Sequence, residues 1–136
     1  MNRPVSSLMQ RWVCSVDMDT ALADVEGLFA REGLSWVPVL DEARTPVGVI
    51  SAADLLRARA AGRDAAATPA WQLCSYRPVT VAPQLPVGEA ARLMVERDIH
   101  HLIVLEEGRI AGVVSALDLV RCLITEPASD PPAGTR

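Results

Sequence analysis

The chain has 136 residues, of which 50% are hydrophobic and 22% are charged, with a net charge of −4 and a sequence pI near 5.1. This balance is ordinary for one compact domain or for two small units that share a core. All basic residues are scattered arginines, which disfavours a nucleic-acid-binding surface, and no apolar run approaches the roughly 18–20 residues of a membrane span.

Two further features bear on the cell compartment. The first ten residues, MNRPVSSLMQ, lack the apolar core of a signal peptide. The three cysteines, Cys14, Cys74 and Cys122, are widely spaced and contain no CxxC pair, so we expect buried, reduced thiols. These features predict a cytoplasmic protein.

The first predicted elements are a short strand and an amphipathic helix. A helical turn after Pro4 leads into the β-prone segment VCSV at 13–16. The helix covers about 20–32 and ends at Gly33. One face of it is apolar through Leu22, Val25, Leu28 and Phe29.

A hairpin and a second helix follow. The apolar run WVPVL at 36–40 and the segment PVGVIS at 46–51 flank a polar turn, which is typical of two antiparallel strands. The helix AADLLRARAA at 52–61 begins directly after Ser51. The unit is therefore strand, helix, hairpin and helix.

The second half of the chain repeats this unit. The matched segments are 5–16 with 70–81, 20–40 with 85–105, and 48–55 with 112–119. The offset is 65 residues for the first two and 64 for the third, because the second copy is one residue shorter in the polar turn. The repeat predicts a strand at 78–81, a helix at about 85–97, a hairpin from 101–105 and 110–115, and a helix at 116–124.

These segments predict an α+β fold of tandem β-α-β-β-α repeats related by a pseudo-twofold axis. The expected boundaries are 1–62 for the first repeat, 63–69 for a linker, 70–125 for the second repeat and 126–136 for a disordered, proline-rich tail. One repeat of about 60 residues cannot cover both faces of its sheet. We therefore expect the two copies to bury each other's exposed face.

The phrase GVISAADL at 48–55 returns as GVVSALDL at 112–119 and has two interpretations. The serine and the aspartate three residues later match a capping box, in which both side chains satisfy free backbone amides at a helix start. Alternatively, the glycine, hydroxyl and acid describe a nucleotide grip, with phosphate at the helix N-terminus and a ribose diol on the carboxylate. The spacing alone does not decide between them.

The whole arrangement resembles a tandem CBS-domain pair, also called a Bateman module. The resemblance rests on the two motifs in matching register and on their flanks, and it covers about residues 5–124. It implies a stand-alone regulatory module that binds an adenosine-containing ligand, such as AMP, ADP, ATP or S-adenosylmethionine, in two clefts between the repeats. It also implies a homodimer that signals to an effector protein in trans or through its own oligomer.

The resemblance assigns a role to particular residues in each cleft. It implies that Asp54 and Asp118 hold ribose, and that Ser51, Ser115 and His101 face phosphate. One adenine pocket would combine Val49 with Val79, Ile99 and His100, and the other would combine Val113 with Cys14, Leu34 and Ser35. The absence of lysine favours a mono- or diphosphate or a sulfonium ligand over a triphosphate.

Some positions depart from the family pattern or suggest other chemistry. Trp36 stands at the position of His101, where its indole is expected to crowd one cleft or to stack on a base. His100 and His101 point to opposite faces of a strand and have no third ligand at useful spacing, so a metal site is not expected. The resemblance places Asp54 and Asp118 in separate clefts, and nothing resembles a nucleophile with its base, so we expect no enzyme activity. The alternative function is a ligand-free dimerisation or scaffold module.

Overall fold

The computed structural model of the chain describes residues 2–125. The tail predicted at 126–136 lies outside the described residues. In chain order the elements are η1 (Val5–Ser7), β1 (Val16–Asp17), α1 (Leu22–Glu32), β2 (Trp36–Leu40), β3 (Pro46–Ser51), α2 (Ala52–Ala60), α3 (Ala70–Leu73), β4 (Ser75–Tyr76), β5 (Thr80–Val81), α4 (Val87–Arg97), β6 (His101–Glu106), β7 (Arg109–Ser115) and α5 (Ala116–Thr125). Each half holds a strand, a helix, a hairpin and a second helix, which confirms the predicted tandem α+β arrangement.

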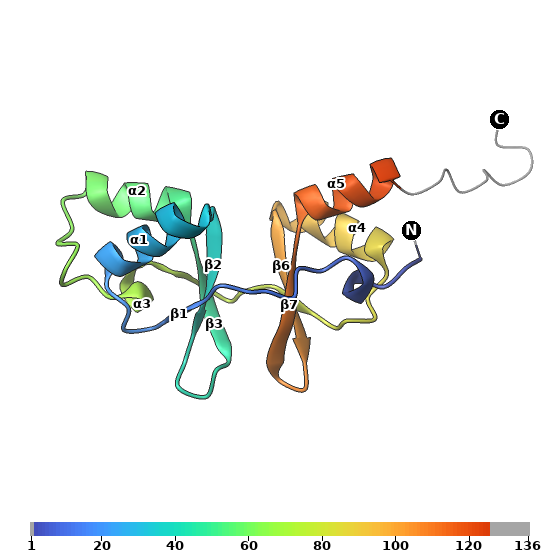
Figure 1. Cartoon of the computed structure of the whole chain (residues 1–136), viewed down its shortest axis with the longest axis horizontal. Coiled ribbons are helices and arrows are strands. Elements are labelled where there is room, and N and C mark those ends of the chain that lie inside the picture. Colours follow the sequence, from blue (N-terminus) through green and yellow to red (C-terminus); the bar gives the residue numbers. More distant parts are fainter. Residues whose placement is uncertain (1, 126–136) are drawn as a thin grey trace, which may run out of the picture.

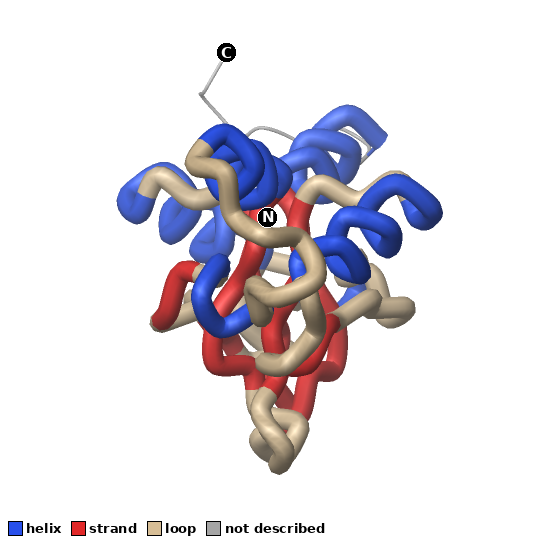
Figure 2. The backbone as a smooth tube through the Cα atoms, turned by 90° about the vertical axis from the view of Figure 1, so that its left-hand side faces the viewer, coloured by secondary structure: helices blue, strands red, loops and turns tan. Residues whose placement is uncertain are grey.

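Each half is built on its own small sheet. The first sheet has the order β1-β2-β3-β4, and the second has the order β5-β6-β7. The hairpins β2–β3 and β6–β7 stand side by side at the centre of the molecule, with the longer helices on their outer sides near the upper ends of the strands (Figure 1). Seen from the side, the strands gather beneath the helices and the hairpin turns project from the opposite end (Figure 2). None of the helices within residues 2–125 has the length and apolar character needed to cross a bilayer.

The two halves exchange their leading segments. Val5 and Met9, which precede the first repeat's strand, are buried in the core of the second repeat with Val87 and Met94. Ala70, which precedes the second repeat's strand, is buried in the core of the first. The exchange ties the halves together, because neither core is complete without a segment that lies beside the other repeat in sequence.

Matching hydrogen bonds hold the exchanged segments. The Val5 amide donates to the Leu85 carbonyl at 2.8 Å, and the Val87 amide donates to the Arg3 carbonyl at 2.8 Å. Their counterparts in the other half are Ala70 N to Thr20 O and Leu22 N to Thr68 O, both also at 2.8 Å. The pseudo-symmetry therefore extends to individual backbone contacts.

The glycine of each repeated motif allows the backbone of the exchanged segment to lie directly against the hairpin strand. A Cβ on Gly48 would lie 2.7 Å from the Ser75 carbonyl oxygen, and one on Gly112 would lie 2.8 Å from the Gln10 carbonyl oxygen. Both distances are too short for any side chain. Glycine is therefore required where the crossing segment runs against β3 or β7.

The first strand of each repeat is shorter than predicted. Only Val16–Asp17 and Thr80–Val81 pair, each in parallel with the first strand of the adjacent hairpin. The preceding residues instead cross between the halves, and this crossing also forms β4, which the hydrophobic pattern does not indicate. The remaining helices and hairpin strands begin and end within two residues of their predicted limits.

Candidate functional site

The repeated serine and aspartate form a capping box in both halves. In the first, the Asp54 amide donates to Ser51 Oγ at 3.3 Å, and Asp54 Oδ2 accepts from the Ser51 amide at 2.7 Å. In the second, the Asp118 amide donates to Ser115 Oγ at 3.0 Å, and Asp118 Oδ2 accepts from the Ser115 amide at 2.9 Å. The capping interpretation is thus confirmed, and it uses one carboxylate oxygen of each aspartate.

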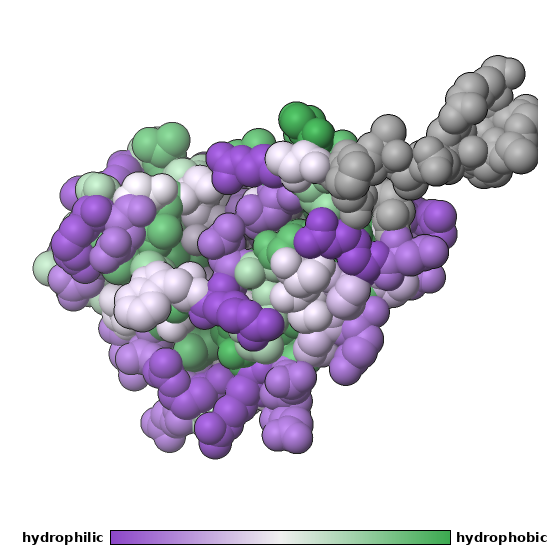
Figure 3. Space-filling view, turned by 45° about the vertical axis from the view of Figure 1, so that its right-hand side comes forward, coloured by the Kyte–Doolittle hydropathy of each residue, from purple (hydrophilic) through white to green (hydrophobic). Residues whose placement is uncertain are grey.

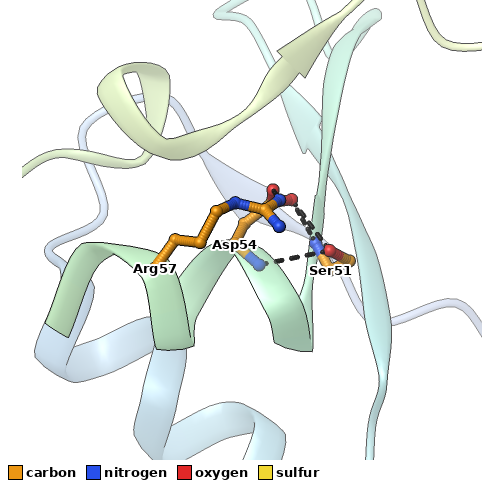
Figure 4. A network of polar contacts seen from close by, with 3 residues as sticks. All are labelled: Ser51, Asp54 and Arg57. Atoms are coloured by element: carbon orange, nitrogen blue, oxygen red, sulfur yellow. Dashed lines mark hydrogen bonds and ion pairs between the residues drawn. The ribbon is translucent and has the colours of Figure 1, made fainter. Parts of the chain in front are cut away.

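The other carboxylate oxygens have different partners. Asp54 Oδ1 accepts from the Arg57 guanidinium, one turn further along α2 (Figure 4). Asp118 Oδ1 accepts from Gln10 Nε2 at 3.4 Å, a residue of the exchanged N-terminal segment. The two motifs have the same helix cap but differ in the donor to the aspartate Oδ1, which is Arg57 in the first repeat and Gln10 in the second.

A cavity of about 570 Å³ lies between the repeats in front of the first motif. We call it the first cleft. It brings together the six residues that the resemblance places in one cleft, Val49, Ser51, Asp54, Val79, Ile99 and His100, and it also contains His101. These residues come from β3 and α2 of the first repeat and from β6 and the segments before β5 and β6 of the second, so the walls belong to both halves.

A smaller cavity of about 240 Å³ lies near the second motif. We call it the second cleft. Of the six residues that the sequence assigned to this site, Cys14, Leu34 and Val113 line it. Ser115 and Asp118 are not part of its lining, and Ser35 lines the first cleft instead. The second cleft therefore contains three of the six residues assigned to the second site.

Gln10 accounts for much of this difference. Its backbone pairs with Val113 as the backbone of Ser75 pairs with Val49 in the first repeat. Its longer side chain reaches Asp118, whereas Ser75 leaves Asp54 facing its cavity. The larger residue on the crossing segment thus separates Asp118 from the second cleft.

Trp36 and His101 meet between the clefts. Their ring centroids are 4.6 Å apart and their planes are inclined by 8°, so they are stacked. Trp36 therefore packs on the imidazole rather than standing alone as a platform for a base. Burial, reinforced by the neighbouring charge of His100 and partly opposed by Asp118, lowers the pKa of His101 below its usual value. In the ligand-free chain this lowered pKa favours the neutral imidazole.

Three charged residues of the first cleft were not predicted. Arg57 and Arg77 bring two guanidinium groups to it, and Asp98 brings a second carboxylate. Arg57 carries a signal in the sequence, because a cation three residues after an acid lies on the same helical face. Arg77 and Asp98 carry none, since both occupy a left-handed backbone conformation, with φ of 64° and 51°, that their residue types do not reveal.

Other features of the described residues fit a ligand less well. A hollow of about 910 Å³ beside the β2–β3 turn is lined by four acids, Asp17, Asp19, Asp41 and Glu42, and by Arg44, which pairs with Asp17 at 3.3 Å. The remaining net negative charge opposes a phosphate-bearing ligand. Within residues 2–125, no group of three or more His, Cys, Asp or Glu side chains is placed to hold a metal ion. The first cleft is the strongest candidate site.

Comparisons with known sequences identify relatives of the chain. It is 30% identical to the uncharacterized protein MK0525 of Methanopyrus kandleri over 91 residues, which is 65% of this chain and 46% of that protein. It is 25% identical to the CBS domain-containing protein YhcV of Bacillus subtilis over 116 residues, covering 85% of this chain and 81% of YhcV. The chain thus spans less than half of one relative and most of the other.

Solved structures with the same fold include three complexes. The CBS domain of a bacterial CNNM/CorC family Mg²⁺ transporter with ATP has a TM-score of 0.82 and 25% identity, covering 92% of this chain and 89% of that one. CBSX2 with AMP has a TM-score of 0.77 and 24% identity, covering 90% and 96%. The CBS domain pair of MJ0100, with 5′-methylthioadenosine and S-adenosylmethionine, has a TM-score of 0.83 and 17% identity, covering 93% and 100%.

The family match covers both halves of the chain. The sequence profile of the CBS domain matches residues 5–61 and again residues 70–125. These two segments are the two repeats that the hairpins, capping boxes and exchanged segments define. The chain therefore belongs to the CBS domain family and contains two CBS domains arranged as a pair.

Proposed function

We propose that this CBS pair is a non-catalytic regulatory module that binds an adenosine-containing ligand in the first cleft. The observation that carries the proposal is the joint wall of that cleft, where the capped α2 terminus and Asp54 face apolar residues from the other repeat. The ATP complex of the transporter domain, at 25% identity, supports the ligand class. AMP, ADP, ATP and S-adenosylmethionine are all within this class.

The residues divide into three roles in the proposed complex. Asp54 Oδ1 accepts hydrogen bonds from the ribose hydroxyls, because Oδ2 is already used by the cap. Ser51, at the N-terminus of α2, faces the phosphate, with His101 beside it. The adenine lies between the apolar side chains of Val49, Val79 and Ile99, beside the backbone of His100.

Binding across both repeats provides the signal. A ligand held by Asp54 on one side and by Ile99 on the other favours the relative placement of the repeats that gives the best contacts with both. Only this difference in affinity between placements can shift their equilibrium. The output passes to an effector protein or to a second copy of the chain.

A homodimer would use the outer helical face. Leu56 of α2 and Val120 of α5 stand at equivalent positions of the two repeats and are 72% and 48% exposed. Leu123 and Ile124 extend the apolar surface along α5, and apolar side chains are visible along the helical side of the molecule (Figure 3). A surface that is similar in both halves suits an isologous contact with a second copy.

The three unpaired cysteines support a cytoplasmic location, where thiols stay reduced.

Thermal melting with the four adenosyl compounds tests the proposal. A ligand present at about 100 times its dissociation constant is expected to stabilise the chain by roughly 2.7 kcal/mol. Guanosine monophosphate provides the control for non-specific nucleotide binding. Unchanged melting temperatures across the panel would favour the alternative, a scaffold in which both motifs act only as helix caps.

A further inference from the structure

The ion pair between Arg57 and Asp54 lies in the first cleft and involves the carboxylate oxygen that the capping box does not use. Asp54 Oδ2 is held by the capping box, so Oδ1 is the oxygen through which the aspartate can bind a ligand. The Arg57 guanidinium contacts that oxygen. The Asp54 side chain is only 12% exposed, whereas that of Arg57 is 71% exposed and therefore has room to move.

The second repeat lacks this arrangement although it has the same residue types. Arg121 is the counterpart of Arg57, three residues after Asp118. Asp118 Oδ1 accepts from Gln10 instead, and Arg121 is not among the residues that line the second cleft. The contact of arginine with the second carboxylate oxygen is therefore a property of the first cleft and not of the repeated motif.

We propose that Arg57 is an electrostatic latch that makes the first cleft select phosphate-bearing nucleotides over the corresponding nucleosides. The inference rests on the proposed binding of an adenosyl ligand. A carboxylate oxygen accepts two hydrogen bonds, so two ribose hydroxyls that both donate to Asp54 Oδ1 displace Arg57 from that oxygen. A nucleotide supplies a new acceptor, since a guanidinium binds a phosphate through two parallel hydrogen bonds. A nucleoside supplies none, so the exchange leaves Arg57 unpaired.

The other charges around the cleft support a small phosphate group. Arg77 adds a second guanidinium to the lining, while Asp98 adds a negative charge. His101 is stacked on Trp36, and its lowered pKa favours the neutral form in the ligand-free chain. The positive charges of Arg57 and Arg77 are balanced by the negative charges of Asp54 and Asp98, which suits a monophosphate better than a longer, more highly charged chain.

Titration calorimetry with AMP and adenosine tests the latch in three proteins: the wild type, Arg57→Gln and Arg121→Gln. A charge-assisted hydrogen bond corresponds to roughly 10- to 100-fold in affinity, so the wild type is expected to prefer AMP by at least about tenfold. Arg57→Gln should bind AMP more weakly and adenosine more tightly than the wild type, because Asp54 Oδ1 is uncovered. Arg121→Gln should retain the wild-type affinities and serves as the matched control.

The outcomes separate the latch from the proposed function. If AMP and adenosine bind the wild type equally, or if Arg57→Gln keeps the wild-type preference, the latch is overturned while adenosyl binding stands. If neither compound binds the wild type, the proposed function fails and the latch fails with it. Arg57→Lys, which keeps the charge without the planar fork, is expected to show an intermediate preference and checks that the effect is not a general loss of structure.

Discussion

The first and second clefts lie beside copies of the same motif, but Asp54 lines the first cleft whereas Asp118 does not line the second. Both motifs end a β-strand, cap a helix with a serine and an aspartate, and place a glycine against a crossing segment. The crossing segment brings Ser75 and Arg77 to the first cleft and Gln10 and Trp12 to the second. The glycine, the serine and the aspartate, which the backbone requires, are the same in both copies, while the side chains that line the two clefts differ.

The comparison also separates structural from ligand-binding roles. The capping boxes would stabilise both helices in the absence of any ligand, and they account for the serine and the aspartate of each motif. The first repeat has in addition a cavity that its own aspartate lines, together with two arginines. The surroundings of the motif, more than the motif itself, distinguish a binding site from a helix cap.

The largest effects are expected at the two motif glycines. Alanine at Gly48 or Gly112 would place its Cβ within 2.8 Å of a backbone oxygen. Each substitution should lower the free energy of unfolding by about 1–3 kcal/mol, as overpacking does. A Cβ added at Gly27, in α1, would meet nothing within 4 Å, so Gly27→Ala should instead stabilise by about 0.5–1 kcal/mol. Urea unfolding of the three variants checks the contrast; equal effects at all three positions would contradict it.

A smaller effect is expected from protonation of His101. Burial lowers its pKa in the folded chain, so below its ordinary pKa the unfolded chain binds protons that the folded chain does not. Stability from this residue is therefore fully present above that ordinary value and is lost as the pH falls toward and through the folded pKa. Trp36 has no titratable ring, so this pH dependence belongs to one side of the stacked pair.

Melting temperatures of the wild type and His101→Gln between pH 7.5 and pH 5 measure this effect. The wild type should lose more stability on acidification than the variant, since the variant has no imidazole to protonate. His100 and Asp118, which act on His101 electrostatically, are unchanged in both proteins. The same loss in both proteins would show that His101 is not responsible.

The smallest effect is expected at the equivalent ends of α1 and α4. Gly33 and Asp98 close these helices in the left-handed conformation, with φ of 64° and 51°. Asp98→Gly should stabilise the second repeat by up to about 1 kcal/mol, and Gly33→Asp should destabilise the first by a similar amount. Chemical denaturation of both variants provides the test. A stability loss in Asp98→Gly would show that the carboxylate has a structural role.

The hairpins and long helices could be predicted because their residues follow regular periodicities. Apolar positions in α1 and α4, and the apolar runs of β2 and β6, indicate both the element and its buried face. The exchange of the leading segments could not be predicted in this way. It depends on contacts of Val5 and Ala70 with distant repeats, and the local sequence carries no sign of which core each residue enters.

The residues predicted for the first cleft all line it, although Arg57, Arg77 and Asp98 were missed, whereas those predicted for the second cleft line it only in part. Val49, Ser51 and Asp54 lie at fixed places of a repeated unit, so the fold brings them to the facing repeat whatever the neighbouring side chains are. The second cleft depends on how far one side chain, Gln10, reaches toward Asp118. Such a contact follows from side-chain length and packing in three dimensions rather than from a pattern along the chain.

The central claim is that one adenosyl ligand binds each chain, in the first cleft. Calorimetric titration of AMP into the wild type, Asp54→Ala and Asp118→Ala tests it most directly. Each substitution should cost about 1 kcal/mol of stability through the lost cap. The account predicts one AMP per chain, with binding lost in Asp54→Ala and retained in Asp118→Ala. Two AMP molecules per chain, with each substitution removing one, would contradict it.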